Sequence, residues 1–327
     1  SIAKKAKILI TGCAGFIGFH LTKKLLNDKK LEIFGIDTID SYYDIKLKYK
    51  RLNILKKNLN FNFFKLDISN KNKLLTNFKK NKYDIVVNLA AQAGVRFSIT
   101  NPENYLKSNV IGFFNILECS KIFKIKKLIY ASSSSVYGDN KDFPLKESAN
   151  TDSPLSFYAA TKKTNEVFAH AYSNTYNLQT IGLRFFTVYG PYGRPDMSLF
   201  KFVDNIYKNK KIDLFNNGKH VRDFTYVEDV VDAISKLIHK KLNFNKIPYI
   251  VFNIASSSPK TLAYYLNVIE GQLNKKAIKN YKNLQLGDVK KTHGDIARLK
   301  KYIKFNIKMS LYEGIVKYIK WYKEFYK

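Results

Sequence analysis

The chain has 327 residues, 45% of them hydrophobic, and carries a formal net charge of +31 at pH 7. It has no run of about 18 apolar residues, which excludes a transmembrane span, and its two cysteines, Cys13 and Cys119, exclude a disulfide framework or a cysteine zinc site, so no metal is expected. Only six of the 57 basic residues are arginine, and the lysines are scattered along the chain, which argues against specific nucleic-acid recognition and favours a solvated surface.

The first predicted elements are a strand, a glycine-rich turn and a helix. Residues 7–11 form a short apolar run, and residues 19–27 have helical periodicity. Between them, Gly12, Gly15 and Gly18 follow a G-x-x-G-x-x-G spacing. Glycines at these places let the backbone turn tightly and approach a pyrophosphate, which then lies at the helix N-terminus. The pattern therefore predicts a dinucleotide site.

The second predicted strand, residues 31–36, ends at Asp37, which follows Gly18 by 19 residues. An acid at this place accepts hydrogen bonds from ribose hydroxyls and repels a 2′-phosphate. Since no arginine follows Asp37 closely, NAD is favoured over NADP as the cofactor.

Strands and helices continue to alternate through the first half of the chain. Further strands are predicted at residues 61–66, 83–89, 127–132 and 179–185, and helices at residues 71–79, 102–123 and 157–176. This alternation predicts an α/β fold with a Rossmann-like, doubly wound parallel sheet. Ligands of such sheets bind beyond the carboxyl ends of the strands, so the residues that follow each strand are candidates for the site.

The predicted helix at residues 157–176 carries a Tyr-x-x-x-Lys pair, Tyr158 and Lys162, and Ser133 precedes Tyr158 by 25 residues in a run of four serines. Residues four apart share one helical face, so the Lys162 ammonium is expected beside the Tyr158 phenol, where it would lower the pKa of that phenol. A phenol with a lowered pKa can serve as general base and acid in an alcohol–ketone step, with a serine hydroxyl orienting the same oxygen. Next to a hydride acceptor, these residues predict NAD-linked oxidation of a carbinol.

The regular alternation ends after Phe186, where residues 190–195 are rich in glycine and proline and predict turns. A helix at residues 228–239 and a strand at residues 249–254 predict a return to the sheet, and an amphipathic helix is predicted at residues 311–326. We therefore expect an NAD-binding domain at residues 1–186 with a return at 223–256. Residues 187–222 and 257–327 are expected to form a smaller α/β lobe that caps the substrate.

Together, these segments resemble the extended short-chain dehydrogenase/reductase family, and within it most nearly the UDP-glucuronate 4-epimerases. The resemblance covers nearly the whole chain. It is carried by residues 11–18, 90–96, 131–138, 158–162, 183–197, 222–226 and 287–289. The stretch at 194–197 is the most specific to the uronate group. Two departures, His220-Val221 and His293-Gly294-Asp295, fall in the predicted cap and affect nucleotide-side details.

The resemblance implies a role for individual residues by position. Tyr158 would be the catalytic base, with Lys162 and Ser133 completing the catalytic set. The NAD site would comprise Gly12, Gly15, Phe16, Ile17, Gly18, Asp37, Asp67, Ile68, Ala90, Ala91, Asn109, Tyr158 and Lys162. The substrate site would include Ser133, Ser135, Arg222 and Asp288. The resemblance also implies a homodimer, formed through the helices at residues 102–123 and 157–176.

The remaining arginines are assigned by their surroundings, because an arginine retained in a lysine-rich chain suggests a need for planar geometry. Arg194 is the predicted clamp for a sugar carboxylate, since its fork matches a carboxylate at two points, and Thr187 is the predicted second contact. A salt bridge that braces the loop is the alternative role for Arg194. Arg184, at the end of an apolar strand, is expected to be structural. Arg96 is a substrate contact or a structural residue.

These residues predict a 4-epimerase that interconverts UDP-glucuronate and UDP-galacturonate through a transient 4-keto sugar, with NAD held in the site. A 4,6-dehydratase is disfavoured because Ser134 and Ser135 stand where an acid and a base are needed. A UDP-glucose or UDP-N-acetylhexosamine 4-epimerase and a UDP-glucuronate decarboxylase remain alternatives. A non-enzymatic dinucleotide-binding protein is disfavoured by the retained Tyr–Lys pair. With no signal-peptide pattern at the N-terminus, the cytoplasm is the expected compartment.

Overall fold

The predicted strands form one parallel sheet. In the computed structural model, which describes residues 4–326, seven strands pair in the order β11-β6-β5-β4-β1-β2-β3. Their bounds are β1 Ala6–Thr11, β2 Leu31–Asp37, β3 Phe61–Lys65, β4 Ile85–Asn88, β5 Lys127–Ser133, β6 Thr180–Phe185 and β11 Tyr249–Ile254. Every neighbouring pair is parallel. The predicted fold class is confirmed.

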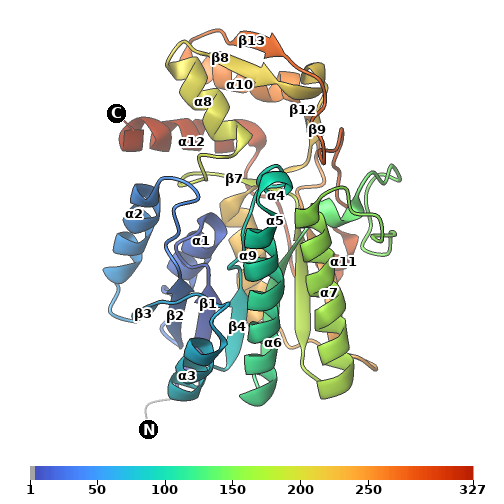
Figure 1. Ribbon diagram of the computed structural model, residues 1–327. Helices are drawn as coiled ribbons and strands as arrows, with labels where there is room; N and C mark the ends of the chain where they lie inside the picture. The colour runs from blue at the N-terminus through green and yellow to red at the C-terminus, as the bar shows by residue number, and fades with distance from the viewer. Residues whose placement is uncertain (1–3, 327) are drawn as a thin grey trace.

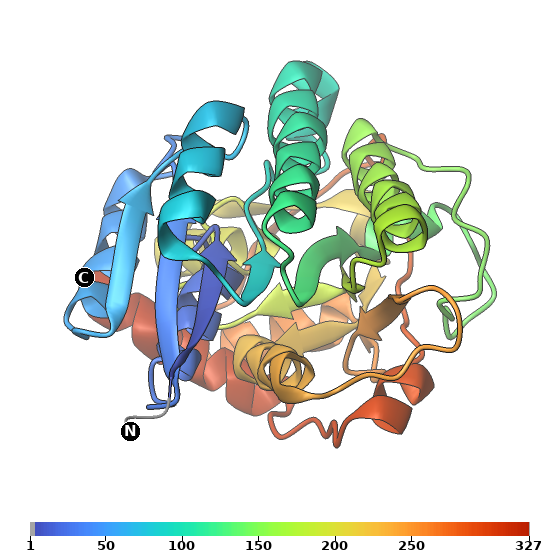
Figure 2. The ribbon, with the colours of Figure 1, turned by 90° about the horizontal axis from the view of Figure 1, so that it is seen from below.

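Helices cover both faces of the sheet, as Figure 2 shows from below. One face carries α3 Lys71–Asn81, α6 Gly112–Ile122 and α7 Phe157–Tyr176, and the other carries α1 Phe16–Leu25, α2 Ile45–Lys56 and α9 Val227–His239. Each layer of helices packs against its face of the sheet and buries a separate apolar core there. In α9, for example, Val227, Val230, Ile234 and Leu237 are buried at the spacing of one helical face.

The helix predicted at residues 102–123 is present from Pro102 to Ile122 and contains a π-helical turn. A short helix α4, Phe97–Thr100, precedes α5, Pro102–Tyr105, which passes into a π-helical turn η1, Leu106–Ile111, and only then into α6. Within this turn the Asn109 side chain bonds the backbone N–H and C=O of Gln92, at 2.7 and 3.1 Å. Such wide turns are common at functional sites, and this one bonds the loop that follows β4 through Asn109.

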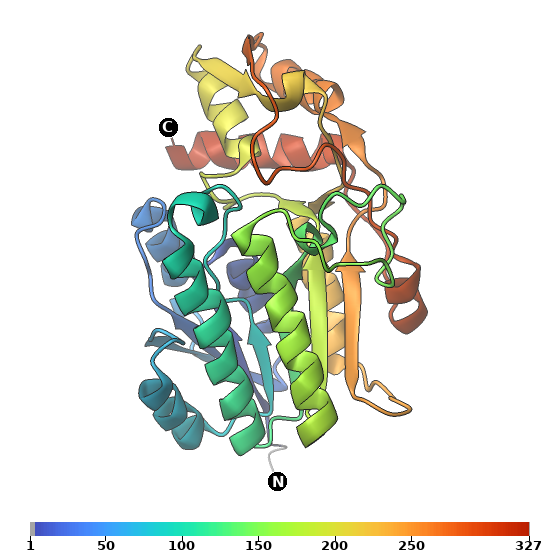
Figure 3. The same ribbon diagram turned by 45° about the vertical axis from the view of Figure 1, so that its right-hand side comes forward.

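A second lobe lies beyond the carboxyl ends of the strands, at the top of Figure 1 and Figure 3. Its helices α8 Ser198–Tyr207, α10 Leu262–Leu273 and α12 Leu311–Tyr326 enclose a separate apolar core. Short strands tie it together: β7 Thr187–Tyr189 with β10 Phe224–Tyr226, β8 Lys211–Leu214 with β13 Ile278–Tyr281, and β9 Val221–Arg222 with β12 Lys260–Thr261. Helix α11, Ala297–Tyr302, packs against β11. Of these helices only α12 was expected from the sequence.

Candidate active site

A cavity of about 440 Å³ lies between the carboxyl ends of the central strands and the second lobe. Residues far apart in the sequence meet in its wall, because parallel strands bring their carboxyl ends to one edge. The predicted site residues among them are Gly12, Gly15, Phe16, Ile17, Gly18, Asp37, Asp67, Ile68, Ala90, Ala91, Ser133, Ser135, Tyr158, Lys162, Thr187 and Arg194. One cavity thus joins the dinucleotide turn, the Tyr–Lys pair and the loop that bears Arg194.

The glycine turn is shaped by close backbone contacts. Gly12 has a φ of +73°, and a Cβ there would lie 2.8 Å from the Ala90 nitrogen. A Cβ on Gly18 would lie 2.0 Å from the Gly12 carbonyl oxygen. Helix α1 begins directly after Gly15, which offers no side-chain cap to the first N–H groups. The turn therefore presents bare backbone to the cavity, which fits a dinucleotide pyrophosphate.

Asp37 ends β2 at the rim of the turn. Its Oδ2 accepts a hydrogen bond from the Ala14 N–H at 3.0 Å, and its Oδ1 accepts one from the Ile39 N–H at 2.8 Å. Burial raises the pKa of Asp37, and the backbone bond from Ile39, Lys48 and the bond from Ala14 oppose that rise. The carboxylate lines the cavity, so the residues present fit the ribose of NAD as well as its pyrophosphate.

Tyr158, Ser133 and Lys162 lie together on one side of the cavity. Lys162, from α7, donates to the Ala131 carbonyl in β5 at 3.2 Å, and its Nζ lies 5.9 Å from the centre of the Tyr158 ring. Burial raises the pKa of Tyr158, while Ser133 and then Arg194 lower it. Burial also lowers the pKa of Lys162 to about 8. The groups that oppose the effect of burial on the Tyr158 pKa are Ser133 and Arg194, and the expected lowering of that pKa by Lys162 stays a prediction.

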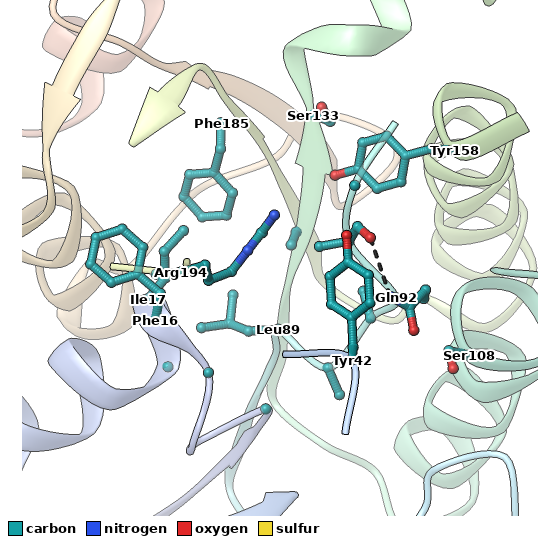
Figure 4. A pocket seen from close by; sticks show the side chains of 18 of the residues that line it. Phe16, Ile17, Tyr42, Leu89, Gln92, Ser108, Ser133, Tyr158, Phe185 and Arg194 are labelled. Atoms are coloured by element: carbon teal, nitrogen blue, oxygen red, sulfur yellow. Dashed lines mark hydrogen bonds between the residues drawn. The ribbon is translucent and has the colours of Figure 1, made fainter. Parts of the chain in front are cut away.

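Arg194 extends its guanidinium into the space between Phe185 and the rings of Tyr42 and Tyr158 (Figure 4). Its Nε and Nη2 donate to the two carboxylate oxygens of Asp196, at 2.9 and 2.8 Å. The Tyr42 hydroxyl donates to the same carboxylate at 3.2 Å. The Arg194 Nη1 has no hydrogen-bond partner among residues 4–326. The salt bridge predicted as an alternative role is present, and it leaves one end of the fork open.

Arg222, Asp288 and Arg96 meet in a separate cluster and do not line the cavity itself. Asp288 pairs with Arg222 at 3.0 Å, with His220 at 3.2 Å and with Arg96 at 3.9 Å. These basic groups hold the pKa of Asp288 below its usual range, against the effect of burial. The three predicted substrate contacts are thus neighbours, next to the cavity-lining Gly94 and Val95.

Asn109 also departs from its predicted place. It is buried behind the cavity wall, where its side chain holds Gln92 and donates to the Thr161 hydroxyl at 3.1 Å. It therefore supports the wall without lining it. Arg184 is structural as predicted, because it forms a buried ion pair with Glu166 at 2.6 Å.

Sequence reasoning missed several residues of the site. Tyr42 and Gln92 line the cavity, and Asp196 pairs with Arg194. The only available signal was the position of Tyr42 just beyond Asp37 and of Asp196 within the uronate-like stretch. No cluster of three or more His, Cys, Asp or Glu side chains suited to a metal occurs within residues 4–326.

Comparison with known proteins identifies the family. The sequence matches the NAD dependent epimerase/dehydratase family over residues 8–255. The chain belongs to this family. It is 50% identical to Protein CapI of Staphylococcus aureus, with 98% of this chain and 99% of that protein aligned. It is 41% identical to a UDP-glucuronate 4-epimerase of Thermodesulfobacterium geofontis, with 97% and 96% aligned.

Solved structures agree with this assignment. The UDP-glucuronic acid 4-epimerase of Bacillus cereus, crystallised with UDP-glucuronic acid and NAD, superimposes with a TM-score of 0.91. The two sequences are 31% identical, and the match covers 97% of this chain and 99% of that one. The predicted membership of the extended dehydrogenase/reductase family and the predicted NAD cofactor are both confirmed.

Proposed function

We propose that the protein is an NAD-dependent 4-epimerase that interconverts UDP-glucuronate and UDP-galacturonate. The observation that carries the proposal is the placement of the Arg194 guanidinium in the same cavity as the Tyr158 hydroxyl. A carboxylate-binding group therefore stands beside a general base in the wall that holds the dinucleotide turn. The relatives named as UDP-glucuronate 4-epimerases support the same substrate.

The chemistry at C4 of the sugar falls to three side chains. Bound NAD supplies the hydride acceptor for the first half of the reaction and the hydride donor for the second. Tyr158 removes the proton from O4 and returns it after the 4-keto sugar has rotated in the site to present its other face. Ser133 holds the same oxygen and favours the phenolate, which its effect on the Tyr158 pKa supports. Lys162, fixed on the Ala131 carbonyl, would hold the nicotinamide ribose.

The sugar carboxylate is assigned to the open end of the Arg194 fork, with Thr187 as its second contact and Ser135 nearby. A 4-keto uronate is a β-keto acid, which loses carbon dioxide when the bond to its carboxylate lies perpendicular to the plane of the ketone, so that the bond electrons can enter the carbonyl π system. A planar, charge-assisted hold on the carboxylate can keep that bond out of this alignment. Under this assignment Arg194 serves both substrate choice and suppression of the decarboxylase reaction.

The nucleotide is assigned to the lobe formed by residues 187–222 and 257–327, of which residue 327 lies outside the described part of the chain. Arg222 of this lobe and Arg96 of the first domain would meet the diphosphate, and Asp288 pairs with both arginines. The domain at residues 1–186, with its return at 223–256, would hold NAD; its residues 1–3 likewise lie outside the described part. Cavity-lining residues from both parts support this division.

The test of the proposal is incubation with UDP-glucuronate and identification of the products by NMR. We expect UDP-galacturonate, formed without consumption of NAD. A UDP-pentose as the main product would indicate a decarboxylase, and no reaction of the NAD-loaded protein would contradict the proposal.

The role of Arg194 is tested by Arg194→Ala with two substrates. We expect turnover of UDP-glucuronate to fall by about 100-fold or more, because a charge-assisted bidentate contact is lost, while any turnover of UDP-glucose changes little. Arg298→Ala, remote in α11, serves as the control. Equal losses on both substrates would contradict the carboxylate assignment.

We also propose that the enzyme is a cytoplasmic homodimer. Its two cysteines are free and buried, which suits a reducing compartment, and no helix within the described residues is long and apolar enough to cross a bilayer. Exposed apolar side chains gather on the neighbouring helices η1, α6 and α7, among them Leu106, Ile111, Phe114, Ile122 and Val167. Such a surface supports pairing with a second copy.

A further inference from the structure

Arg51, in α2, is a fully buried cation with no acidic partner. Its exposed fraction is 0%, and no carboxylate of the described residues forms an ion pair with it. Its fork instead donates to backbone: Nη1 to the Ala14 carbonyl at 2.8 Å, and both Nε and Nη2 to the Tyr192 carbonyl, at 3.2 and 2.5 Å. Nη1 also donates to the Tyr43 hydroxyl. A buried cation is costly unless its donors are satisfied, and here two loops supply the acceptors.

The two carbonyls belong to the two halves of the active site. Ala14 lies inside the glycine turn, between Gly12 and Gly15, and its own N–H is bonded to Asp37. Tyr192 lies two residues before Arg194 and holds a left-handed backbone with φ of +62°. A non-glycine residue in that region is strained, so the loop needs outside contacts to keep this shape.

A second contact ties the same loop to the same domain. His20, in α1, lies 2.7 Å through its Nε2 from the carbonyl oxygen of Pro191, and its ring packs edge-on against Phe16 and Phe19. In its neutral form His20 donates that bond, because a carbonyl only accepts. Successive carbonyls of the loop, at 191 and 192, are thus held by α1 and α2.

We propose that Arg51 is a positioning residue that joins the dinucleotide turn to the loop bearing Arg194, so that cofactor binding at the turn sets the carboxylate clamp. A planar fork is needed because one side chain must reach two carbonyls in fixed directions, which a lysine ammonium on a flexible stem does not reproduce. The link between the two loops is inferred from the hydrogen bonds of Arg51 described above. That Arg194 then binds a sugar carboxylate rests on the proposed function.

Hydrogen exchange tests the link without substrate. NAD added to the cofactor-free protein is expected to slow exchange of the amides at residues 190–197 by about fivefold or more. In Arg51→Lys this protection is lost while that of the glycine turn remains. Arg298→Lys is the matched control, since Arg298 also donates to a backbone carbonyl, that of Val251 at 3.1 Å. Full protection of the loop in Arg51→Lys would overturn the proposal.

A double-mutant cycle tests the consequence for the substrate. In NAD-loaded Tyr158→Phe protein, which prevents turnover, Arg51→Lys is expected to weaken UDP-glucuronate binding by about tenfold and UDP binding by less than about twofold. Added to Arg194→Ala, it should weaken UDP-glucuronate binding no further, because its effect passes through Arg194. Additive losses, or equal losses for UDP, would show a merely structural role.

Failure of the proposed function and failure of the role given to Arg51 lead to different results. If the unmutated protein does not bind UDP-glucuronate, the proposed function fails, and the exchange measurement still decides the role of Arg51. If Arg51→Lys does not fold, Tyr43→Phe replaces it, since this change removes one hydrogen-bond partner of the Arg51 fork; because Tyr43 also lines the cavity, exchange of the amides at residues 190–197 is measured first and must lose part of its protection by NAD. A smaller loss that disappears in the Arg194→Ala background is then expected, and an additive loss would overturn the proposal.

Discussion

Desolvation and hydrogen bonding shift the pKa of Tyr158 in opposite directions. Burial raises the pKa of the phenol, and the Ser133 hydroxyl and the Arg194 guanidinium oppose that rise. The same Arg194 that we assign to the sugar carboxylate is one of the groups that favour the phenolate, so substrate recognition and base strength are linked at this residue.

Tyr158→Phe is expected to lower kcat by about 10²–10⁴-fold, because it removes the group that transfers the O4 proton. Binding of UDP-glucuronate, measured by calorimetry, should change little, since the ring remains. Tyr83→Phe is the control: Tyr83 is also buried, but its hydroxyl bonds Asn77 at 2.6 Å beside α3, away from the cavity. A Tyr158→Phe protein with unreduced turnover would show that another group moves the proton.

His20 makes stability depend on pH. Burial lowers its pKa to about 4 from 6.5, so below pH 6.5 the unfolded chain takes up a proton that the folded chain does not. The stability from neutral His20 is complete above pH 6.5 and is lost as the pH falls toward 4, by on the order of 3 kcal/mol at most.

His20→Gln keeps an N–H donor for Pro191 and cannot titrate. Urea midpoints between pH 7 and 4 should therefore fall less steeply for His20→Gln than for the unmutated protein. His170→Gln, at an exposed position of α7, is the control and should follow the unmutated profile. Parallel curves for the unmutated and His20→Gln proteins would contradict the assignment.

The sequence was sufficient to bring to one cavity the residues whose place follows from local spacing. Gly12, Asp37, Tyr158 and Ser133 line the predicted site, because each follows a strand or shares a helix face with its partner. Asp196 and Arg51 could not be assigned, since their roles depend on which distant atoms reach them: the Arg194 fork in one case and the Ala14 and Tyr192 carbonyls in the other. Asn109 does not line the cavity, because its side chain bonds Gln92 and Thr161, and these contacts could not be predicted from local spacing.

Among the elements, the junction of the glycine turn with α1 is the most sensitive to added volume. Gly18→Ala would place a methyl group 2.0 Å from the Gly12 carbonyl oxygen, so α1 must move away from the turn. Overpacking of this kind costs about 1–3 kcal/mol, and we expect NAD affinity to fall by about 10- to 100-fold, measured by calorimetry on the cofactor-free protein.

Gly271→Ala is the matched control, because no heavy atom lies within 4 Å of a Cβ at this position in α10. Replacing a helical glycine by alanine should raise the free energy of unfolding by about 0.5–1 kcal/mol and leave NAD affinity unchanged. Equal NAD affinity of the Gly18→Ala protein would contradict the role given to the turn.

The helices that sequence reasoning missed were hidden for different physical reasons. In α8 the buried Leu199, Phe202, Val203 and Ile206 do follow helical spacing, but the glycine- and proline-rich segment before them suggested continuing turns. In α2 the lysines obscure the pattern, because the buried face includes Lys48 and Arg51. The strands of the sheet were easier to predict, since burial on both faces leaves continuous apolar runs.

For the whole molecule, the exposed apolar side chains of α6 and α7 are the basis of the proposed dimer. Replacement of Phe114 and Val167 by lysine should convert the protein to a monomer at micromolar concentration, measured by light scattering, because buried charges destabilise such an interface. Both side chains are exposed in the single chain, so folding should be unaffected. A pair of exposed positions elsewhere, Leu59 and Leu286, provides the control. An unchanged mass would contradict this interface.

Because Arg194 is paired with Asp196, the long-range attraction of substrates and the discrimination between acidic and neutral sugars depend on different groups. The chain carries a formal net charge of +31 at pH 7 and draws any nucleotide sugar toward the protein, in a manner that salt weakens. The charge of Arg194 is already balanced by the Asp196 carboxylate, so Arg194 adds little to the long-range electrostatic attraction of substrates. Discrimination between an acidic and a neutral sugar therefore rests on the short-range fit of one guanidinium edge, and ionic strength should alter how often substrates arrive more than which of them the enzyme selects.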